Sequence, residues 1–247
     1  MKAALVACLL AVPVFAQDDF AALVKKGDDA DSALKTKEAL AAFLAAEKLQ
    51  PNDASLLVKI AKQYGESQTD SPDKNMRREV GNKALEYSKR AVALAPKDGE
   101  AHLALAVSYG RVAPYLDNKT KIAYSKLVKE EVDQAIALDP RNDLAWHVLG
   151  AWNYELANLN TILRAVAKLI YGEIPKATNE DAAKAFRKAI ELNPKRVANW
   201  VELGRTLIEQ GNKVEAKTAL EKGISLPNRM RDDPEVKERA RVALKKV

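Results

Sequence analysis

The sequence has a single cysteine, Cys8, and only two histidines. Cys8 lies in an N-terminal segment that we expect to be removed. The mature chain then has no disulfide bond, thiolate metal site or cysteine nucleophile. Aromatic residues are also scarce, at 6%, whereas alanine, leucine, lysine and glutamate are abundant. These residues favour helices, and a β-sheet protein would need more β-branched and aromatic residues. The composition therefore predicts an all-α protein.

A long apolar run is missing as well, and the sequence offers only a short one at its start. Residues 3–16 are apolar, follow Lys2, and end in Val14-Phe15-Ala16 before the polar Gln17. Such a run is shorter than the roughly 20 residues that span a bilayer. It has the charged start, apolar centre and small-residue end of a secretory signal. We expect residues 1–16 to be a signal peptide and residues 17–247 to be one helical domain, exported to the periplasm or secreted.

The chain also lacks any dense block of one charge. The formal net charge is +6, but the charged residues, 30% of the chain, are spread along it. A mildly basic surface suits an acidic peptide, and a membrane surface or lipid stays open as an alternative. Nucleic acid is not expected, because no basic stripe with interleaved aromatics occurs.

A short phrase ending in Leu-x-Pro or Leu-Pro recurs through the chain, with its prolines at 51, 96, 140, 194 and 227. Before each of the first four prolines, residues at offsets of five, eight and twelve would lie on one helical face. This face consists of Ala39, Phe43 and Ala46, then Ala84, Ser88 and Ala91, then Val128, Val132 and Ala135, and finally Ala182, Phe186 and Ala189. Proline then ends the helix, because it excludes the preceding residue from the α region.

A second helix follows each of these prolines and has its own stripe of packing residues. The stripes are Leu57/Ile60/Ala61/Tyr64, His102/Leu105/Ala106/Tyr109, Trp146/Leu149/Gly150 and Trp200/Leu203/Gly204/Leu207. The small third residue marks where the paired helix crosses. This order of residues is that of the tetratricopeptide (TPR) repeat. The pattern predicts a TPR-like α-solenoid of about five helix-turn-helix units.

The repeat length varies, which indicates insertions. Successive prolines are 45, 44, 54 and 33 residues apart, against about 34 for a bare TPR unit. We expect insertions at 65–80, 111–127 and 156–180, the last with an amphipathic helix around 159–171 that ends at Gly172-Glu173-Ile174-Pro175. Thr178 or Asn179 would cap the next helix. A final helix within 233–247, with a stripe of Val236, Ala240, Val242 and Leu244, would cap the open end of the solenoid.

From about Glu100 to Pro227 the sequence resembles the regulator of microtubule dynamics family. The resemblance rests on HVLGAWNYELANLN, on the long third insertion, on the Gly172-x-Ile174-Pro175 break and on the Leu226-Pro227 ending. It implies an all-helical, TPR-like fold without catalytic residues. Eukaryotic members are associated with microtubules, and some with organelle contacts and lipid. An exported chain does not meet microtubules, so we carry over the fold and the non-enzymatic nature but not the cellular role.

No nucleotide-binding, metalloprotease or serine-hydrolase motif occurs in the sequence. His102 and His147 occupy first helices of neighbouring units, and neither has a metal-site partner three or four residues away. Trp146 and Trp200 take the packing position of the repeat and are predicted to be core, whereas Trp152 lies off that register and is predicted to be exposed. We therefore expect no enzyme, no cofactor and no metal.

The concave face of a solenoid is built from first helices, and a partner would bind there. Counting away from the packing stripes gives the candidate residues Val58, Lys62, Leu103, Arg111, His147, Tyr154, Val201 and Arg205. Together they form an apolar floor with a few cations, suited to a protein or peptide with acidic groups. The alternative is a lipid or small-ligand carrier that uses the amphipathic insert around 159–171. The partner's identity and the oligomeric state stay open.

Overall fold

The computed structural model describes residues 14–71 and 73–247, and most of them are helical. No strand occurs within these ranges, so the all-α prediction is confirmed. The helices are α1 (Val14–Ser32), α2 (Thr36–Glu47), α3 (Ala54–Ser67), α4 (Lys74–Leu94), α5 (Gly99–Val112), α6 (Asn118–Leu138), α7 (Asp143–Ala157), α8 (Thr161–Tyr171), α9 (Asn179–Leu192), α10 (Val197–Glu209), α11 (Lys213–Ser225) and α12 (Asp233–Leu244), with short 3₁₀ turns η1 (Gln68–Asp70) and η2 (Ala113–Tyr115). Of the expected signal segment, residues 1–13 lie outside the described ranges, and Val14 is the first residue of α1.

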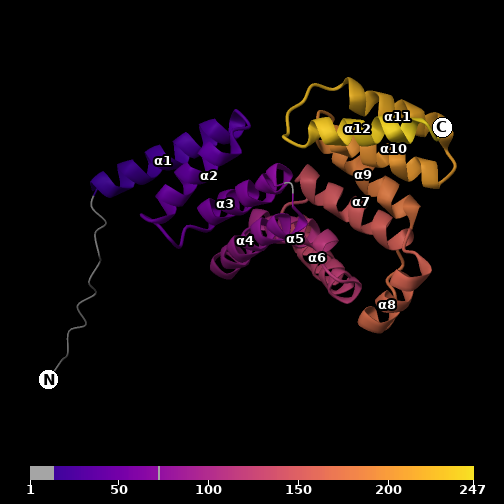
Figure 1. Cartoon of the computed structure of the whole chain (residues 1–247), viewed down its shortest axis with the longest axis horizontal. Helices are drawn as coiled ribbons and strands as arrows, with labels where there is room; N and C mark the ends of the chain where they lie inside the picture. Colours follow the sequence, from indigo (N-terminus) through magenta and orange to yellow (C-terminus); the bar gives the residue numbers. More distant parts are fainter. Residues whose placement is uncertain (1–13, 72) are drawn as a thin grey trace.

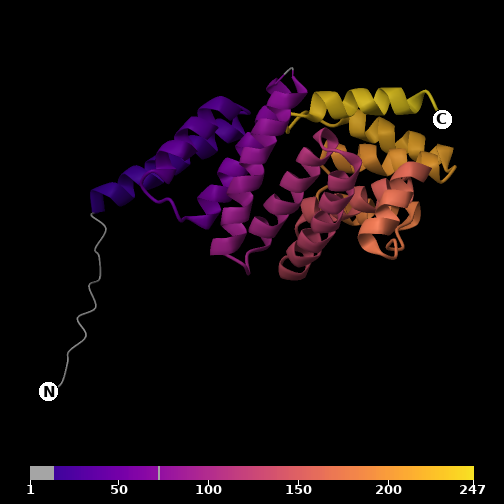
Figure 2. The same cartoon turned by 60° about the horizontal axis from the view of Figure 1, so that its bottom comes forward.

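The helices pack as successive hairpins that stack side by side along a curve (Figures 1 and 2). The pairs are α1/α2, α3/α4, α5/α6, α7/α9 and α10/α11, and α12 covers the last of them. This arrangement confirms five helix-turn-helix units and a C-terminal capping helix. Within the described ranges, no helix is both long and apolar enough to cross a bilayer.

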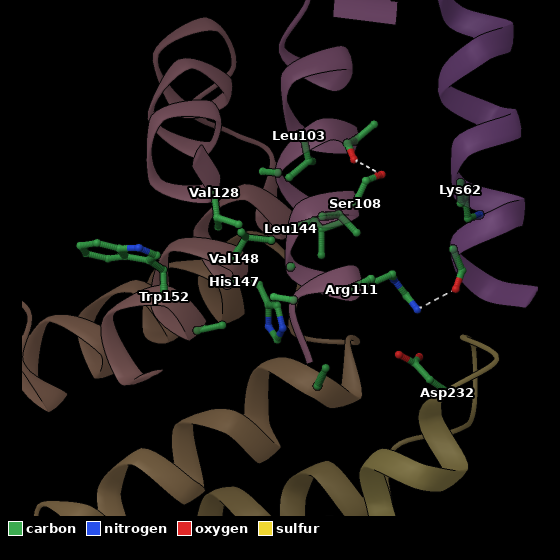
Figure 3. A pocket seen from close by; sticks show the side chains of 18 of the residues that line it. Lys62, Leu103, Ser108, Arg111, Val128, Leu144, His147, Val148, Trp152 and Asp232 are labelled. Carbon is green, nitrogen blue, oxygen red and sulfur yellow. Dashed lines mark hydrogen bonds between the residues drawn. The ribbon is translucent and has the colours of Figure 1, made fainter. Parts of the chain in front are cut away.

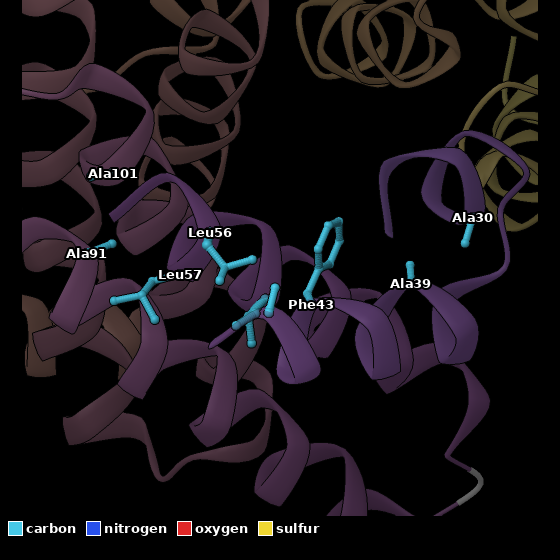
Figure 4. Close-up of a cluster of buried hydrophobic side chains, with 9 residues drawn as sticks. Ala30, Ala39, Phe43, Leu56, Leu57, Ala91 and Ala101 are labelled. Carbon is cyan, nitrogen blue, oxygen red and sulfur yellow. The ribbon is translucent and has the colours of Figure 1, made fainter. Parts of the chain in front are cut away.

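The periodic face that precedes each proline is the buried face of the second helices. All twelve of the residues predicted from the offsets are buried, and Phe43, Ser88, Val132 and Phe186 are completely so. In the N-terminal units, Phe43 of α2 packs among Leu56 and Leu57 of α3 (Figure 4). Alanines of neighbouring helices complete this cluster and allow the helices to approach closely.

The small residues at the crossing points have the predicted role. A Cβ atom added to Gly150 of α7 would lie 2.8 Å from the ring of Phe186 on α9. One added to Gly204 of α10 would lie 2.6 Å from Leu220 on α11. Both distances are shorter than van der Waals contact, so the paired helices pack against the bare glycine backbone.

Asx residues after the prolines begin the next helices. The Asp53 carboxylate accepts the Leu56 amide at 2.8 Å, and the Asn142 side chain accepts the Leu144 amide at 3.0 Å. Such N-caps satisfy amides that the first turn of a helix leaves free. Thr178 has the same role for α9 and accepts the Asp181 amide at 3.0 Å, as predicted.

The described residues of the insertions are mostly helical. The first two lengthen the second helices of their units, so α4 and α6 each have 21 residues. The third forms α8 and the loop after it. Gly172, which ends α8, has φ +77°, a left-handed conformation that glycine adopts without strain.

Trp146 and Trp200, predicted to be core residues, are not fully buried, although Trp200 packs against the cluster around Phe186. Both are partly exposed, and each indole Nε1–H donates to a proline carbonyl six residues earlier, Pro140 or Pro194, at 2.9 Å. The turn carbonyl needs a donor because proline interrupts the helix there. Both tryptophans therefore stabilise the turn, at the edge of the core.

The prediction that Trp152 is exposed is wrong. Its side chain is buried among Leu85, Leu105 and Val128, and its Nε1–H donates to the Ser125 carbonyl at 2.9 Å. The repeat spacing places Trp152 off the stripe of α7 that packs on α9. It takes no account of α6 of the preceding unit, against which this face of α7 packs.

His102 occupies the turn-fastening position in its unit and makes a second polar contact as well. Its Nε2 lies 3.0 Å from the Pro96 carbonyl, and its Nδ1 lies 2.6 Å from the Glu131 carboxylate. Burial lowers the pKa of His102, but the bonds to Glu131 and Pro96 outweigh this effect and raise the pKa above its ordinary value of 6.5. The charged ring can donate to both acceptors at once.

We expect His102→Gln to reduce stability in a pH-dependent way. A raised histidine pKa contributes stability that is fully present below the unfolded-state pKa of 6.5 and is lost as the pH rises through the folded-state pKa. The loss in unfolding free energy should therefore be about 2 kcal/mol at pH 6 and smaller at pH 9, in urea titrations. Trp200→Phe removes the equivalent bond to Pro194 without a titrating group, so its effect should not change with pH. Parallel pH profiles for the two variants would contradict this assignment.

Candidate functional site

The first helices of neighbouring units enclose a cavity of about 600 Å³ on the concave face (Figure 3). α3, α5 and α7 supply its walls, with further residues from α6 and from the start of α10. The segment between α11 and α12 contributes Met230, Arg231 and Asp232. The prediction that first helices line the inner face is confirmed.

The floor of the cavity is apolar and follows the helical period. On α5, Leu103, Val107 and Arg111 are four residues apart and border the cavity, while Leu103 and Val107 also pack against the cluster that contains Val132 of α6. On α7, Leu144, Val148 and Ala151 form the corresponding row. These rows lie at the edge of the contact between paired helices, where the first helices of neighbouring units meet. The repeat pattern itself therefore creates this floor.

Charged residues gather at the α3 side of the cavity. Lys62 pairs with Asp31 at 2.6 Å and lies 3.8 Å from Glu66. Burial raises the pKa of Glu66 above its ordinary value, although the nearby Lys62 opposes this shift. Arg111 donates to the Gly65 carbonyl at 3.1 Å and, among the described residues, forms no ion pair. Its guanidinium also opposes the raised pKa of Glu66 and borders the cavity.

His147 lies on the cavity wall at the α7/α10 contact. Its Nδ1 lies 2.9 Å from the Asn199 side-chain oxygen, and its ring meets Phe186 edge to face. Burial lowers the pKa of His147, so the ring is neutral near pH 7 and carries its proton on Nδ1. Its Nε2 is then a hydrogen-bond acceptor.

The structure brings five of the eight predicted site residues to the cavity: Val58, Lys62, Leu103, Arg111 and His147. The other three lie elsewhere. Val201 is fully buried beneath α12, and Tyr154 and Arg205 stack on each other with Arg205 also bonded to Glu202 at 2.6 Å. In the last unit, α12 and neighbouring side chains cover these positions on α10, so they do not line the cavity.

Sequence reasoning missed two parts of the site. Val107, Leu144, Val148 and Ala151 could have been found by continuing the four-residue spacing along the first helices. Met230, Arg231 and Asp232 had no signal in the sequence, because they reach the cavity only through the curvature of the whole solenoid.

The amphipathic insert lies outside the cavity. Leu159, just before α8, is the one residue of 159–171 that lines it. α8 packs on α6 through Ala167 and leaves Ile162 and Leu169 exposed, at 68% and 78%. Among the described residues, no group of histidines, cysteines and carboxylates is arranged to hold a metal ion.

Comparison with known proteins agrees with this architecture. The sequence profile of "Regulator of microtubule dynamics protein 1-3" matches residues 23–247. The chain belongs to the regulator of microtubule dynamics family. Regulator of microtubule dynamics protein 1 of Mus musculus is 32% identical over 158 residues, which cover 64% of this chain and 52% of that protein. Regulator of microtubule dynamics protein 3 of Xenopus laevis is 25% identical over 225 residues, which cover 88% of this chain and 48% of that protein.

This member of the family spans about half the length of these relatives. Its fold is also seen in a thermophilic TPR protein of Thermus thermophilus. That crystal structure superposes with a TM-score of 0.65 at 18% identity and covers 92% of this chain and 99% of its own. This likeness shows the TPR fold.

Proposed function

We propose that the protein is a non-enzymatic scaffold that holds an acidic protein or peptide segment in the concave cavity. The observation that carries the proposal is the cavity itself, where an apolar floor on α5 and α7 lies beside the guanidinium of Arg111. Apolar side chains of a partner would bury themselves against Leu103, Val107 and Val148. A carboxylate would pair with Arg111, because a guanidinium matches its planar geometry.

The polar groups around the cavity support binding over catalysis. Lys62 is paired with Asp31, and Arg196 is paired with Asp143. His147 donates to the amide oxygen of Asn199, which does not activate the ring as a carboxylate would. These contacts hold neighbouring units together, so Arg111 is the group that we assign to the partner.

We expect Arg111→Glu to weaken capture of the acidic partner. Repulsion replaces a charge-assisted hydrogen bond, which should weaken binding by about tenfold or more. The measurement is a pull-down with the immobilised full chain from extracts and medium of its own cells. The control is Arg141→Glu, which makes the same charge change at an exposed residue outside the cavity. Equal capture by the two variants would exclude the cavity as the site.

A lipid or small apolar ligand is the second candidate, favoured by the apolar floor. Such a carrier would use the cavity, since α8 presents its exposed apolar residues elsewhere. Mass spectrometry of the purified protein under native conditions separates the two functions. A stoichiometric co-purified lipid would support the carrier, and peptide binding by lipid-free protein would support the scaffold.

We also propose that the protein is exported and that cleavage after Ala16 leaves Gln17 as its first residue. The support is the charged start and short apolar run of residues 1–16. Intact-mass measurement of protein from the periplasm and the medium tests this proposal. A full-length mass in the cytoplasmic fraction alone would contradict it.

A further inference from the structure

The C-terminal part of the chain returns to the N-terminal units. Arg231, in the segment before α12, donates to Thr36 Oγ1 at 2.9 Å and to Thr69 Oγ1 at 3.3 Å. It also forms an ion pair with Asp70. These partners lie on α2 and η1, more than 160 residues earlier in the chain. The units of a solenoid ordinarily contact only their neighbours, so this contact between the two ends is not required by the stacking.

Both sides of the contact are held in place by their own bonds. Asp233 is buried, and its carboxylate accepts the amides of Arg229 at 2.7 Å and Met230 at 2.8 Å. This shapes the segment from Pro227 to Asp232, which we name the strap. On the other side, Gln68 of η1 donates to the Arg77 carbonyl at 2.9 Å and fixes the turn that carries Asp70.

The strap lies over the candidate site. Met230, Arg231 and Asp232 line the same cavity as Lys62 and Arg111, and Figure 3 shows Asp232 facing Arg111 across the opening. In Figures 1 and 2 the segment before α12 lies near the C-terminal end of α3. The strap thereby joins the two ends of the curved stack across its open side.

The contact is also weak enough to open. The Arg231 and Asp70 side chains keep 27% and 31% of their surface exposed, and such pairs contribute little and are screened by salt. The two hydroxyl partners add hydrogen bonds from the Arg231 guanidinium, and Thr36 is buried. An opening of the strap would therefore expose polar groups that water can solvate.

We propose that the strap is a gate: the Arg231–Asp70 contact closes the solenoid into a ring over the cavity, and a ligand exchanges only when this contact opens. The inference rests on the proposed function, because it concerns access to the same cavity. The gate therefore limits the rate at which a ligand enters or leaves the cavity.

The first test needs no ligand. Hydrogen exchange of the strap amides is compared in the full chain, in Arg231→Ala and in Asp70→Ala, with circular dichroism to verify helicity. We expect exchange to become about tenfold faster in both variants. The control is Arg229→Ala, which removes the same charge two residues away at an exposed side chain without an ion pair in the described ranges. The exchanged pair Asp70→Arg with Arg231→Asp should restore slow exchange. Unchanged exchange in Arg231→Ala would overturn the gate.

The second test measures access to the cavity. The probe is 8-anilinonaphthalene-1-sulfonate, an apolar anion that suits an apolar floor beside Arg111. Its fluorescence should rise about tenfold faster with Arg231→Ala than with the unaltered chain or with Arg229→Ala. High salt should increase the rate of this rise for the unaltered chain, because salt screens the Arg231–Asp70 ion pair. Equal rises in all forms, including no rise in any, would overturn the gate. Failure of the proposed function is distinguishable, because a gate can be seen in exchange while Arg111→Glu leaves partner capture unchanged.

Discussion

Phe186→Ala should lower the unfolding free energy by about 3–5 kcal/mol, in urea titrations followed by circular dichroism. The side chain is completely buried between α7, α9 and α10, so its removal leaves a cavity that rigid helix backbones cannot fill. Its ring also meets His147 edge to face, at 5.5 Å between centroids. Loss of this contact would remove a packing partner of His147, which lines the cavity of the candidate site.

A substitution at Gly150 tests the contact between α7 and the Phe186 ring more directly. In the unaltered chain, Gly150→Ala places a methyl group 2.8 Å from the Phe186 ring and should cost about 1–3 kcal/mol. In a Phe186→Ala background the clash is gone, and the better helix propensity of alanine should stabilise by up to about 1 kcal/mol. The substitution therefore changes sign between backgrounds. Gly110→Ala, whose added methyl group meets nothing within 4 Å, should stabilise in both. Additive effects of the substitutions at 150 and 186 would contradict the close contact between Gly150 and the Phe186 ring.

The fold was predictable because its signals are local. A proline that ends a helix and alanines at fixed offsets before it act within one hairpin, and each hairpin then buries its stripe against the next. The same logic located Val58, Leu103 and Arg111, since all three lie on first helices and border the cavity. Leu103 illustrates the limit of this reasoning, because it is almost completely buried yet still lines the cavity.

The errors come from contacts between elements that are distant in sequence. Val201 has the spacing of an inner-face residue, but α12 packs over it. Trp146 and Trp200 have the spacing of core residues, but a proline carbonyl draws each indole to the edge of the turn. The strap depends on the summed curvature of five units, which no local pattern encodes. Sequence spacing predicts on which face of its helix a side chain lies. It does not predict which distant element packs over that face.

The packed face of the capping helix α12 also differs from the sequence prediction. The sequence pattern places Val242 on the packed stripe of α12, but it is 51% exposed, and Ala243 packs in its place. Val236 is 1% exposed and lies against Val197 and Leu220. The packed row is therefore Val236, Ala240 and Ala243, with spacings of four and three residues, as one face of a helix requires.

Val236→Asp should destabilise the C-terminal unit by about 3–5 kcal/mol, because the carboxylate would be buried without a partner. Val242→Asp, the same change on the same helix at an exposed position, should stay within about 0.5 kcal/mol. Urea titration gives the magnitudes, and equal losses would contradict the assigned face of α12.

The response to Val236→Asp should also be local, because the units of a solenoid contact mainly their neighbours. Hydrogen exchange should accelerate in α10, α11 and α12, whereas α3 and α4 should keep their protection. The strap is the one exception that the structure predicts. Its shape depends on Asp233, the first residue of α12, so undocking of this helix should also free Arg231 from Thr36 and Asp70. Faster exchange at η1, in the second unit of the stack, would then report that the ring had opened.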